Sequence, residues 1–141
     1  MLIQRYEIFL KTSARTDMID LTGQVQEKLD KSEITNGILL VFVPGATASL
    51  TTIEYESGVL NDLARAIERL APEGINYEHD LRWGDGNGYS HVRAALLKPS
   101  LSVPVIDGRL TLGTWQQIVL LDFDNRPRER RILIQVIGEG N

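Results

Sequence analysis

The sequence predicts an α+β fold in which a mostly antiparallel sheet, shaped as a sandwich or barrel, is flanked by two helices. Three observations predict it. Short β-prone segments follow one another closely in the second half of the chain, and two earlier segments have the periodicity of amphipathic helices. Asp107-Gly108 between two strand-like runs indicates a tight hairpin. The length of 141 residues is typical of one domain, which we expect to span residues 1–141.

Local patterns place the elements along the chain. Alternation of polar and apolar residues predicts strands, and apolar residues three or four apart predict helices. The first predicted elements are a strand at 2–11, a helix that begins after Asp17 and ends at Asn36-Gly37, a strand at 38–43 buried on both faces, a strand at 48–53 and a helix at 56–70. Residues 73–90 lack a clear period and predict a long loop. The remaining predicted strands are 92–97, 102–106, 109–112, 116–123 and 131–137.

Composition excludes several classes of function. The net charge of −4 argues against a dedicated nucleic-acid-binding protein, although a local pocket can still be basic. The absence of cysteine excludes disulfides, thiolate metal sites and cysteine nucleophiles. No apolar run approaches the length of about 18 residues that a membrane span needs, and the N-terminus lacks the apolar core of a signal peptide. We therefore expect a cytoplasmic protein with no membrane or nucleic-acid partner.

Both histidines lie in one stretch that is rich in polar residues and glycine. His79 and His91 flank a segment that includes Asp85 and Asn87. Imidazole is the commonest metal ligand and the usual general acid or base near neutral pH, and carboxylates add oxygen ligands. We expect His91 to open the strand at 92–97, where its side chain would be held firmly. The alternative is that each histidine only forms hydrogen bonds within a turn.

Three other segments offer groups for binding or chemistry. Residues 44–52 carry small hydroxyl side chains around a glycine and could bind an anion such as phosphate, or could be a threonine-rich strand. Glu54 could act as a general base or ligand, whereas Glu56 fits better in the first turn of a helix. The segment 112–117 contains Trp115 and Gln116, which could fix a ligand or pack in the core. The charged turn at 124–131 is either solvated or lends an arginine to a phosphate.

Several motifs together resemble the YjbQ-like family, also called uncharacterised protein family 0047. The resemblance extends from about Tyr6 to Gly138. Its motifs are Ala48-Ser49-Leu50-Thr51 followed by Glu54, Gly88-Tyr89-Ser90-His91, Ser100-Leu101-Ser102-Val103-Pro104, and Gly108-Arg109-Leu110-Thr111-Leu112-Gly113-Thr114-Trp115-Gln116.

The resemblance implies a β-rich, sandwich-like fold assembled as a homotrimer, with a site near the subunit contacts that holds a metal or an anion. It also implies the activity of a thiamine-phosphate synthase. This transferase joins a hydroxymethylpyrimidine diphosphate to a thiazole phosphate and releases pyrophosphate, here as a weak side activity. The alternative is a non-catalytic trimeric protein that binds a metal or a small anion, such as a phosphorylated molecule. The third reading, a hydrolase acting through metal-bound water, is disfavoured because two family histidines are missing.

The resemblance assigns roles position by position. It carries over His91 and Glu54 as the catalytic candidates, and Asn87, Thr114, Trp115 and Gln116 as substrate-binding candidates, with Asn87 where an acid often stands. The chemistry of the residues themselves adds Arg93 as a phosphate-binding candidate, and His79 and Asp85 beside His91 as ligands for Mg²⁺ or Zn²⁺. Two departures from the family pattern matter: Gly45-Ala46 stands where many members have His-Thr, and Asp122-Phe123-Asp124 stands where many have Glu-His-Arg. A three-histidine metal site therefore does not carry over, and His79 with Asp80 or Asp85 is the expected substitute.

Overall fold

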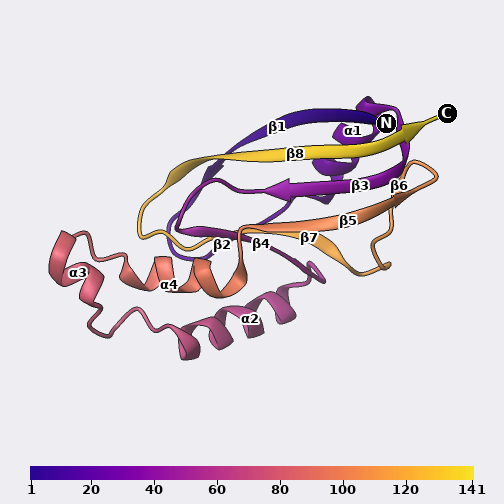
Figure 1. The fold of residues 1–141 in the computed structure, drawn as a ribbon. Helices are drawn as coiled ribbons and strands as arrows, with labels where there is room; N and C mark the ends of the chain where they lie inside the picture. The colour runs from indigo at the N-terminus through magenta and orange to yellow at the C-terminus, as the bar shows by residue number, and fades with distance from the viewer.

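The computed structural model describes all residues from Met1 to Asn141 and confirms the α+β fold (Figure 1). Two antiparallel sheets are present: a five-stranded sheet in the order β1-β8-β3-β5-β6 and a three-stranded sheet in the order β2-β7-β4. The elements are β1 (Leu2–Thr12), β2 (Asp17–Asp20), α1 (Thr22–Ser32), β3 (Ile34–Phe42), β4 (Ala48–Ile53), α2 (Ser57–Leu70), α3 (Glu78–Trp83), α4 (Gly88–Leu97), β5 (Ser100–Ile106), β6 (Arg109–Leu110), β7 (Gln117–Asp122) and β8 (Arg128–Gly140).

Strand β7 lies at the centre of the packing because both of its faces are buried. Ile118 and Leu120 contribute to the main core, between the five-stranded sheet, α1 and the small sheet. Val119 and Leu121 point the other way, into a second cluster with Ile67 of α2 and Ala94 of α4. The molecule therefore has three layers, with α2 and α4 covering the far face of the small sheet, below it in Figure 1.

Strand β3 alternates instead of being buried on both faces, so that prediction was wrong. Leu39 and Val41 are fully buried, whereas Ile38 is 57 % exposed and Leu40 and Phe42 are 37 % exposed. The apolar run follows from the strand's position between β8 and β5, with one face on the core. The other face is the outer surface of the five-stranded sheet, and no helix of this chain covers it (Figure 1).

The first predicted helix is shorter at both ends. Asp17–Asp20 pairs with Val119–Asp122 of β7 as the edge strand β2, so tertiary pairing overrides the helical pattern there. Glu33 ends α1 in the left-handed conformation at φ 59°, ahead of Asn36-Gly37. Gly37 lies inside β3 opposite Gly138, and a Cβ on it would lie 2.0 Å from the Ile137 carbonyl oxygen.

The segment predicted as a loop and a strand contains two helices. Residues 73–90 include α3 and the start of α4, and residues 92–97 continue α4 instead of forming a strand. The buried residues of this part of α4 are Arg93 and Ala94, which continue the buried face of Tyr89 and Ser90 four residues earlier, as helical spacing requires. The chain therefore has four helices, where the sequence predicted two. Not one of the helices combines the length and the apolar character needed to cross a membrane.

Two local predictions are confirmed. Asp107 and Gly108 have φ values of 51° and 77°, as a two-residue hairpin turn with two left-handed positions requires, and they connect β5 to β6. Glu56 caps α2, because its carboxylate accepts a hydrogen bond from the backbone N–H of Val59 at 2.8 Å.

Candidate functional site

A polar cavity of about 480 Å³ opens where α3, α4, the start of β4 and the start of β8 meet. Nine residues line it, and only two are hydrophobic: Ala46, Thr47, His79, Trp83, Asp85, Asn87, His91, Arg128 and Arg130. Imidazoles and a carboxylate form one wall and two guanidinium groups form the other. Four of the predicted site residues, His79, Asp85, Asn87 and His91, are thus brought together in space.

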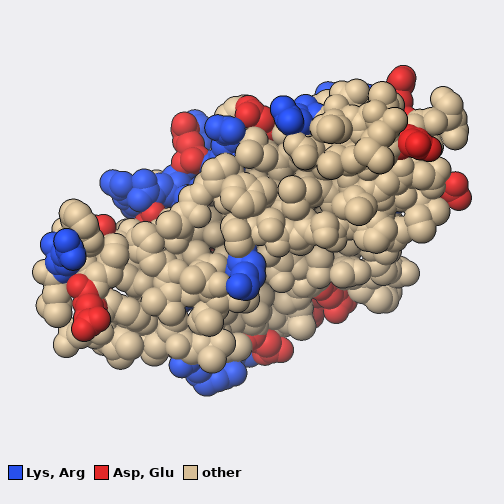
Figure 2. Space-filling view, in the orientation of Figure 1, with Lys and Arg blue, Asp and Glu red and all other residues tan.

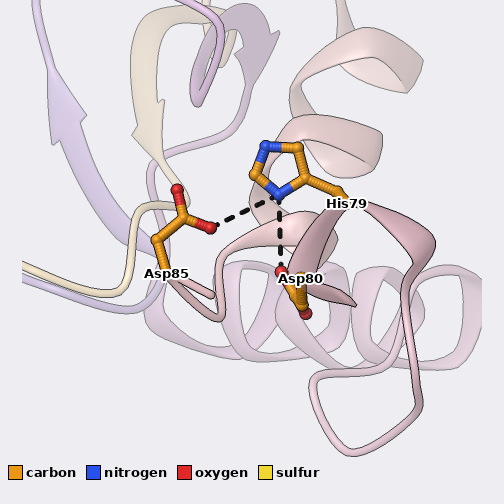
Figure 3. Close-up of side chains that lie close together, drawn as sticks. All are labelled: His79, Asp80 and Asp85. Carbon is orange, nitrogen blue, oxygen red and sulfur yellow. Dashed lines mark hydrogen bonds and ion pairs between the residues drawn. The ribbon is translucent and has the colours of Figure 1, made fainter. Parts of the chain in front are cut away.

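The two imidazoles lie next to each other in the cavity lining. The ring centroids of His79 in α3 and His91 in α4 are 4.4 Å apart, with the ring planes tilted by 40°. The Nδ1 of His79 lies 3.4 Å from a carboxylate oxygen of Asp80 and 3.4 Å from one of Asp85 (Figure 3). Ligand atoms of His79, Asp80 and Asp85 all lie within 4.8 Å of one another. His91 belongs to a helix and not to the predicted strand, yet its ring lines the cavity.

The Asn87 amide lies between two carboxylates and can satisfy only one of them through its NH₂ group. Its Nδ2 donates to Asp124 at 3.3 Å, while the same amide turned over would donate to both carboxylate oxygens of Asp85, at 3.1 and 3.2 Å. In the first orientation the amide oxygen faces the Asp85 carboxylate. The turned-over orientation is therefore the favourable one, because it places the NH₂ group of Asn87 and not its oxygen on the Asp85 carboxylate.

The start of α4 is fixed against α3 and the small sheet. The N–H of Gly88 donates to the Asp80 carboxylate at 2.8 Å, and the Ser90 hydroxyl donates to the Phe123 carbonyl oxygen at 2.5 Å. Gly88 permits this approach because a Cβ there would lie 2.6 Å from the Cβ of Tyr77. The glycine of the Gly88-Tyr89-Ser90-His91 motif thus brings α4, and with it His91, against α3.

The opposite wall is built on two ion pairs beneath the cavity. Arg130 donates to Asp122 from Nε at 2.7 Å and from Nη2 at 2.9 Å, and Arg128 donates from Nε to Asp124 at 2.6 Å. Both carboxylates are fully buried. The Thr47 hydroxyl connects the pairs, since it accepts from Arg130 at 2.7 Å and donates to Asp124 at 3.1 Å.

The charge state of Asp124 follows from its contacts. Burial alone would raise the pKa of this carboxyl, but hydrogen bonds from Arg128, Asn87 and the backbone N–H of Asn125 outweigh it and hold the pKa below its ordinary value. Asp124 is therefore ionised at neutral pH and balances the charge of Arg128. Sequence reasoning raised an arginine of the turn at 124–131 as an anion ligand but did not identify Arg128 and Arg130; their alternation with Glu129 at the start of β8 was the available signal.

Five predicted residues lie outside the cavity. Arg93 is 4 % exposed and points away from it, donating to the Ala71 carbonyl oxygen at 2.9 Å and to Glu68 at 2.5 Å. The other four, Glu54, Thr114, Trp115 and Gln116, lie around the far end of β4 and β7.

The far end of the small sheet has its own polar contacts. Gln116 connects to β4 by donating to the Thr52 hydroxyl at 3.1 Å, and its side-chain oxygen accepts the N–H of Gly113 at 3.0 Å. Trp115 is 72 % exposed and is not a core residue. A strand of the length of β4 spans about 20 Å, so Glu54 does not reach the histidines within one chain.

The two positions of the missing family histidines have different surroundings. Phe123 is fully buried in the second hydrophobic cluster, between the small sheet and the helices. Gly45 lies beside the cavity, and a Cβ on it would come within 3.0 Å of Nη1 of Arg130. Asp122 and Asp124, the acids on either side of Phe123, pair with the two arginines that line the cavity.

Fold and site define an α+β protein with a histidine-lined polar cavity at one end of its smaller sheet. The chain belongs to the UPF0047 YjbQ-like family, because the family model described as "UPF0047 protein YjbQ-like" matches residues 6–139. It is 40 % identical over 131 residues to a UPF0047 protein of Archaeoglobus fulgidus, covering 93 % of this chain and 99 % of that protein. It is 37 % identical over 131 residues to UPF0047 protein YugU of Bacillus subtilis, with 92 % and 96 % covered.

Solved structures support the same conclusion. A YbjQ-like protein of unknown function from Sulfolobus solfataricus P2 superposes with a TM-score of 0.88 at 32 % identity, covering 98 % of this chain and all of that one. A hypothetical protein from Aeropyrum pernix K1 gives a TM-score of 0.90 at 34 % identity, with 96 % and 99 % covered. The resemblance inferred from the motifs is thereby confirmed for family and fold.

Proposed function

We propose that the cavity binds a divalent metal ion and a small oxyanion side by side. The observation that carries this proposal is the division of its lining, with imidazole and carboxylate donors on one wall and two guanidinium groups on the other. Carboxylate binds both Mg²⁺ and Zn²⁺, imidazole binds Zn²⁺, and guanidinium matches the geometry of phosphate oxygens. The anion that we expect is the phosphate group of a small molecule.

The metal would be held by His79, Asp80 and Asp85. Two ligands that share a tetrahedral Zn²⁺ at about 2.1 Å lie about 3.4 Å apart, whereas adjacent ligands of an octahedral Mg²⁺ lie about 3.0 Å apart. The two separations of 3.4 Å from Nδ1 of His79 fit zinc better. His91, on the same wall, could complete the ligand set or accept a proton from a bound ligand.

The anion would need the metal for its charge balance. Arg128 and Arg130 are each neutralised by a buried aspartate, so the arginine wall supplies N–H groups but little net positive charge. Nη1 of Arg130 and the two Nη atoms of Arg128 form no hydrogen bond within the chain and can donate to an anion. We therefore expect phosphate to bind to the metal-loaded protein and only weakly to the metal-free one.

Titration calorimetry tests both the metal site and the anion site. Zn²⁺ affinity should fall by at least tenfold in His79→Ala and Asp85→Asn, while Arg128→Gln should retain zinc binding and lose inorganic phosphate binding by at least tenfold. Arg65→Gln is the matched control, because Arg65 is an exposed arginine of α2 that pairs only with Asp62. Unchanged zinc affinity in both His79→Ala and Asp85→Asn would overturn the metal site. Equal phosphate affinity with and without zinc would overturn the dependence of anion binding on the metal.

The second candidate is the transferase reaction of a thiamine-phosphate synthase. It is favoured by the same juxtaposition, since loss of a diphosphate group needs a metal and cationic donors around the leaving oxygens. Of the two catalytic candidates, only His91 lines the cavity within one chain. Complementation of a thiamine auxotroph, followed by His91→Ala, tests the reaction; rescue by the mutant at the wild-type level would remove His91 from it.

A homotrimer is the proposed assembly, and the uncovered face of the five-stranded sheet is the proposed contact. Ile3, Ile137, Ile38 and Pro104 lie in register across four strands of this face. The side of the molecule drawn in Figure 2 carries few charged side chains over β8, β3 and β5. A second copy would remove this apolar face from water. Sedimentation of Ile38→Lys should show smaller particles than the wild type, and Leu81→Lys, an exposed leucine of α3, is the control.

A further inference from the structure

Strand β1 lies at the end of the five-stranded sheet, and one of its two edges has no partner. The strand is 11 residues long, pairs only with β8 and runs along the margin of the sheet (Figure 1). The backbone N–H and C=O groups on its other edge form no hydrogen bond within the chain. Proteins usually protect such an edge with a short strand, a proline or a bulge, because it is a template for pairing with another chain. Residues 2–12 contain no proline and pair with β8 without a shift in register, so this edge is long and regular.

The outer face of β1 carries both apolar and charged side chains. Every second residue from Ile3 to Lys11 is exposed, and the residues between them are half-buried or buried. Ile3 is 56 % exposed and Phe9 is 71 % exposed, while Arg5 and Glu7 lie between them with opposite charges. Charges on an edge strand keep out a partner wherever like charges would meet, so they select the register in which pairing is possible.

We infer that β1 pairs with β1 of a second copy of this chain, antiparallel and about a two-fold axis at Tyr6. Arg5 of each copy then lies opposite Glu7 of the other, and Ile3 of each copy lies opposite Phe9 of the other. Opposite charges, and an aromatic side chain opposite an aliphatic one, stabilise antiparallel pairing. The two-fold axis repeats both pairs, and it keeps the outer faces of the two sheets on the same side.

Other registers of the same two strands are less favourable. An axis at Arg5 or at Glu7 would place two like charges directly opposite each other, and an axis at Ile8 would place Arg5 opposite Lys11. An axis between two residues would set the exposed side chains of one copy opposite the core-facing side chains of the other. Tyr6 is therefore the axis that pairs opposite charges and also covers both apolar side chains.

Arg5 and Glu7 keep atoms free for such a contact. Within its own chain Arg5 donates only from Nε, to the side-chain oxygen of Gln135 at 2.9 Å, so both Nη atoms are unused. One carboxylate oxygen of Glu7 lies 3.0 Å from Nε of Arg131, and the other forms no hydrogen bond. Pairing with a second copy therefore adds contacts without breaking those already made.

The contact would join two five-stranded sheets into one continuous sheet of ten strands. It uses the edge of the sheet and not the face proposed above for the homotrimer, so the two contacts can exist together. A chain that forms both would assemble as six copies, with two-fold axes between two trimers. The two-fold pairing is thus a separate contact from the three-fold one, and it does not depend on what the polar cavity binds.

Cysteine cross-linking tests the register in the full chain, which contains no cysteine of its own. Directly opposite residues of antiparallel strands have Cα atoms about 4.5–5.5 Å apart and can form a disulfide, whereas diagonal neighbours are about 7–8 Å apart and cannot. An equal mixture of Arg5→Cys and Glu7→Cys, incubated to exchange copies and then oxidised, should give at least tenfold more linked dimer than either variant alone. Asn61→Cys, at an exposed position of α2, is the control, and its mixture with Arg5→Cys should give no more dimer than the single variants.

The products also separate this contact from the homotrimer. The double variant Arg5→Cys with Glu7→Cys should stop at a linked dimer, because a two-fold contact is closed. Linked trimers would assign these thiols to a three-fold contact and overturn the pairing, as would a mixture that links no more than its components. Ile38→Lys, which should break up the trimer, should leave the cross-link unchanged; its loss in that variant would also overturn an edge contact independent of the face.

Discussion

Removal of the Arg130 guanidinium should destabilise the protein far more than removal of a neighbouring exposed one. Asp122 is fully buried and receives two hydrogen bonds from Arg130, at 2.7 and 2.9 Å. Arg130→Met leaves this carboxylate buried without its partner, which typically costs about 3–5 kcal/mol. Asp122 keeps the Thr12 hydroxyl and the N–H of Asp124 as donors, so we expect the lower end, about 3 kcal/mol.

The matched control is Arg131→Met. Arg131 pairs with Glu7 at 3.0 Å, but the two side chains are 52 % and 44 % exposed, and solvent screening reduces such a pair to about 0–1 kcal/mol. Urea unfolding followed by circular dichroism, at one protein concentration, measures both. With an m-value of about 1.5 kcal/mol/M, the midpoint of Arg130→Met should fall by about 2 M and that of the control by less than about 0.7 M. Equal shifts in the two variants would refute the buried ion pair.

Three further outcomes follow from local geometry. Gly88→Ala should lose about 1–3 kcal/mol of stability and weaken Zn²⁺ binding, because its Cβ would lie 2.6 Å from Tyr77. The control Gly74→Ala, whose Cβ would have nothing within 4 Å, should change neither the stability in thermal melts nor the Zn²⁺ affinity in calorimetry. Glu56→Ala should cost about 0.5–1 kcal/mol in urea unfolding through loss of the α2 cap, and the exposed Glu54→Ala less than about 0.5 kcal/mol. The pKa of Asp124 is lowered in the folded state, so its contribution to stability is present at neutral pH and is lost as the pH falls below about 4. In acid unfolding, the free energy of unfolding of Asp124→Asn should therefore fall less steeply with decreasing pH in this range than that of the wild type.

The elements that the sequence predicted well are those whose signals are local. The helix α2 has a regular apolar spacing and an acidic cap, and the Asp107-Gly108 turn requires two left-handed residues that this pair provides. The polar stretch with both histidines correctly indicates the position of the cavity, since His79, Asp85, Asn87 and His91 line it.

The failures depend on contacts that the local pattern does not contain. Residues 92–97 are a short apolar run, and such runs do not distinguish a strand from a helix. The segment becomes α4 because Ser49 and Phe123 form hydrogen bonds with the helix and Asp80 binds its first N–H. Arg128 and Arg130 are not singled out by the pattern because a charged turn followed by charges at alternate positions is usually solvated. The pattern does not show that Asp124 is buried under this turn, or that Arg130 reaches Asp122 at the end of β7.

The ion pairs beneath the cavity are more easily explained by the site than by stability. Replacing a buried ion pair with uncharged residues of similar volume is often neutral for a fold, or even stabilising. The double substitution Asp122→Asn with Arg130→Met removes both charges, while the amide oxygen introduced at position 122 can still accept the N–H of Asp124. We therefore expect this double variant to recover at least about 1 kcal/mol of the loss in Arg130→Met, and yet to bind phosphate at least tenfold more weakly in the presence of zinc. Urea unfolding and calorimetry on the same preparation would separate the two roles. A double variant that stays as unstable as Arg130→Met, or that binds phosphate like the wild type, would show that the pair serves the fold and not the anion.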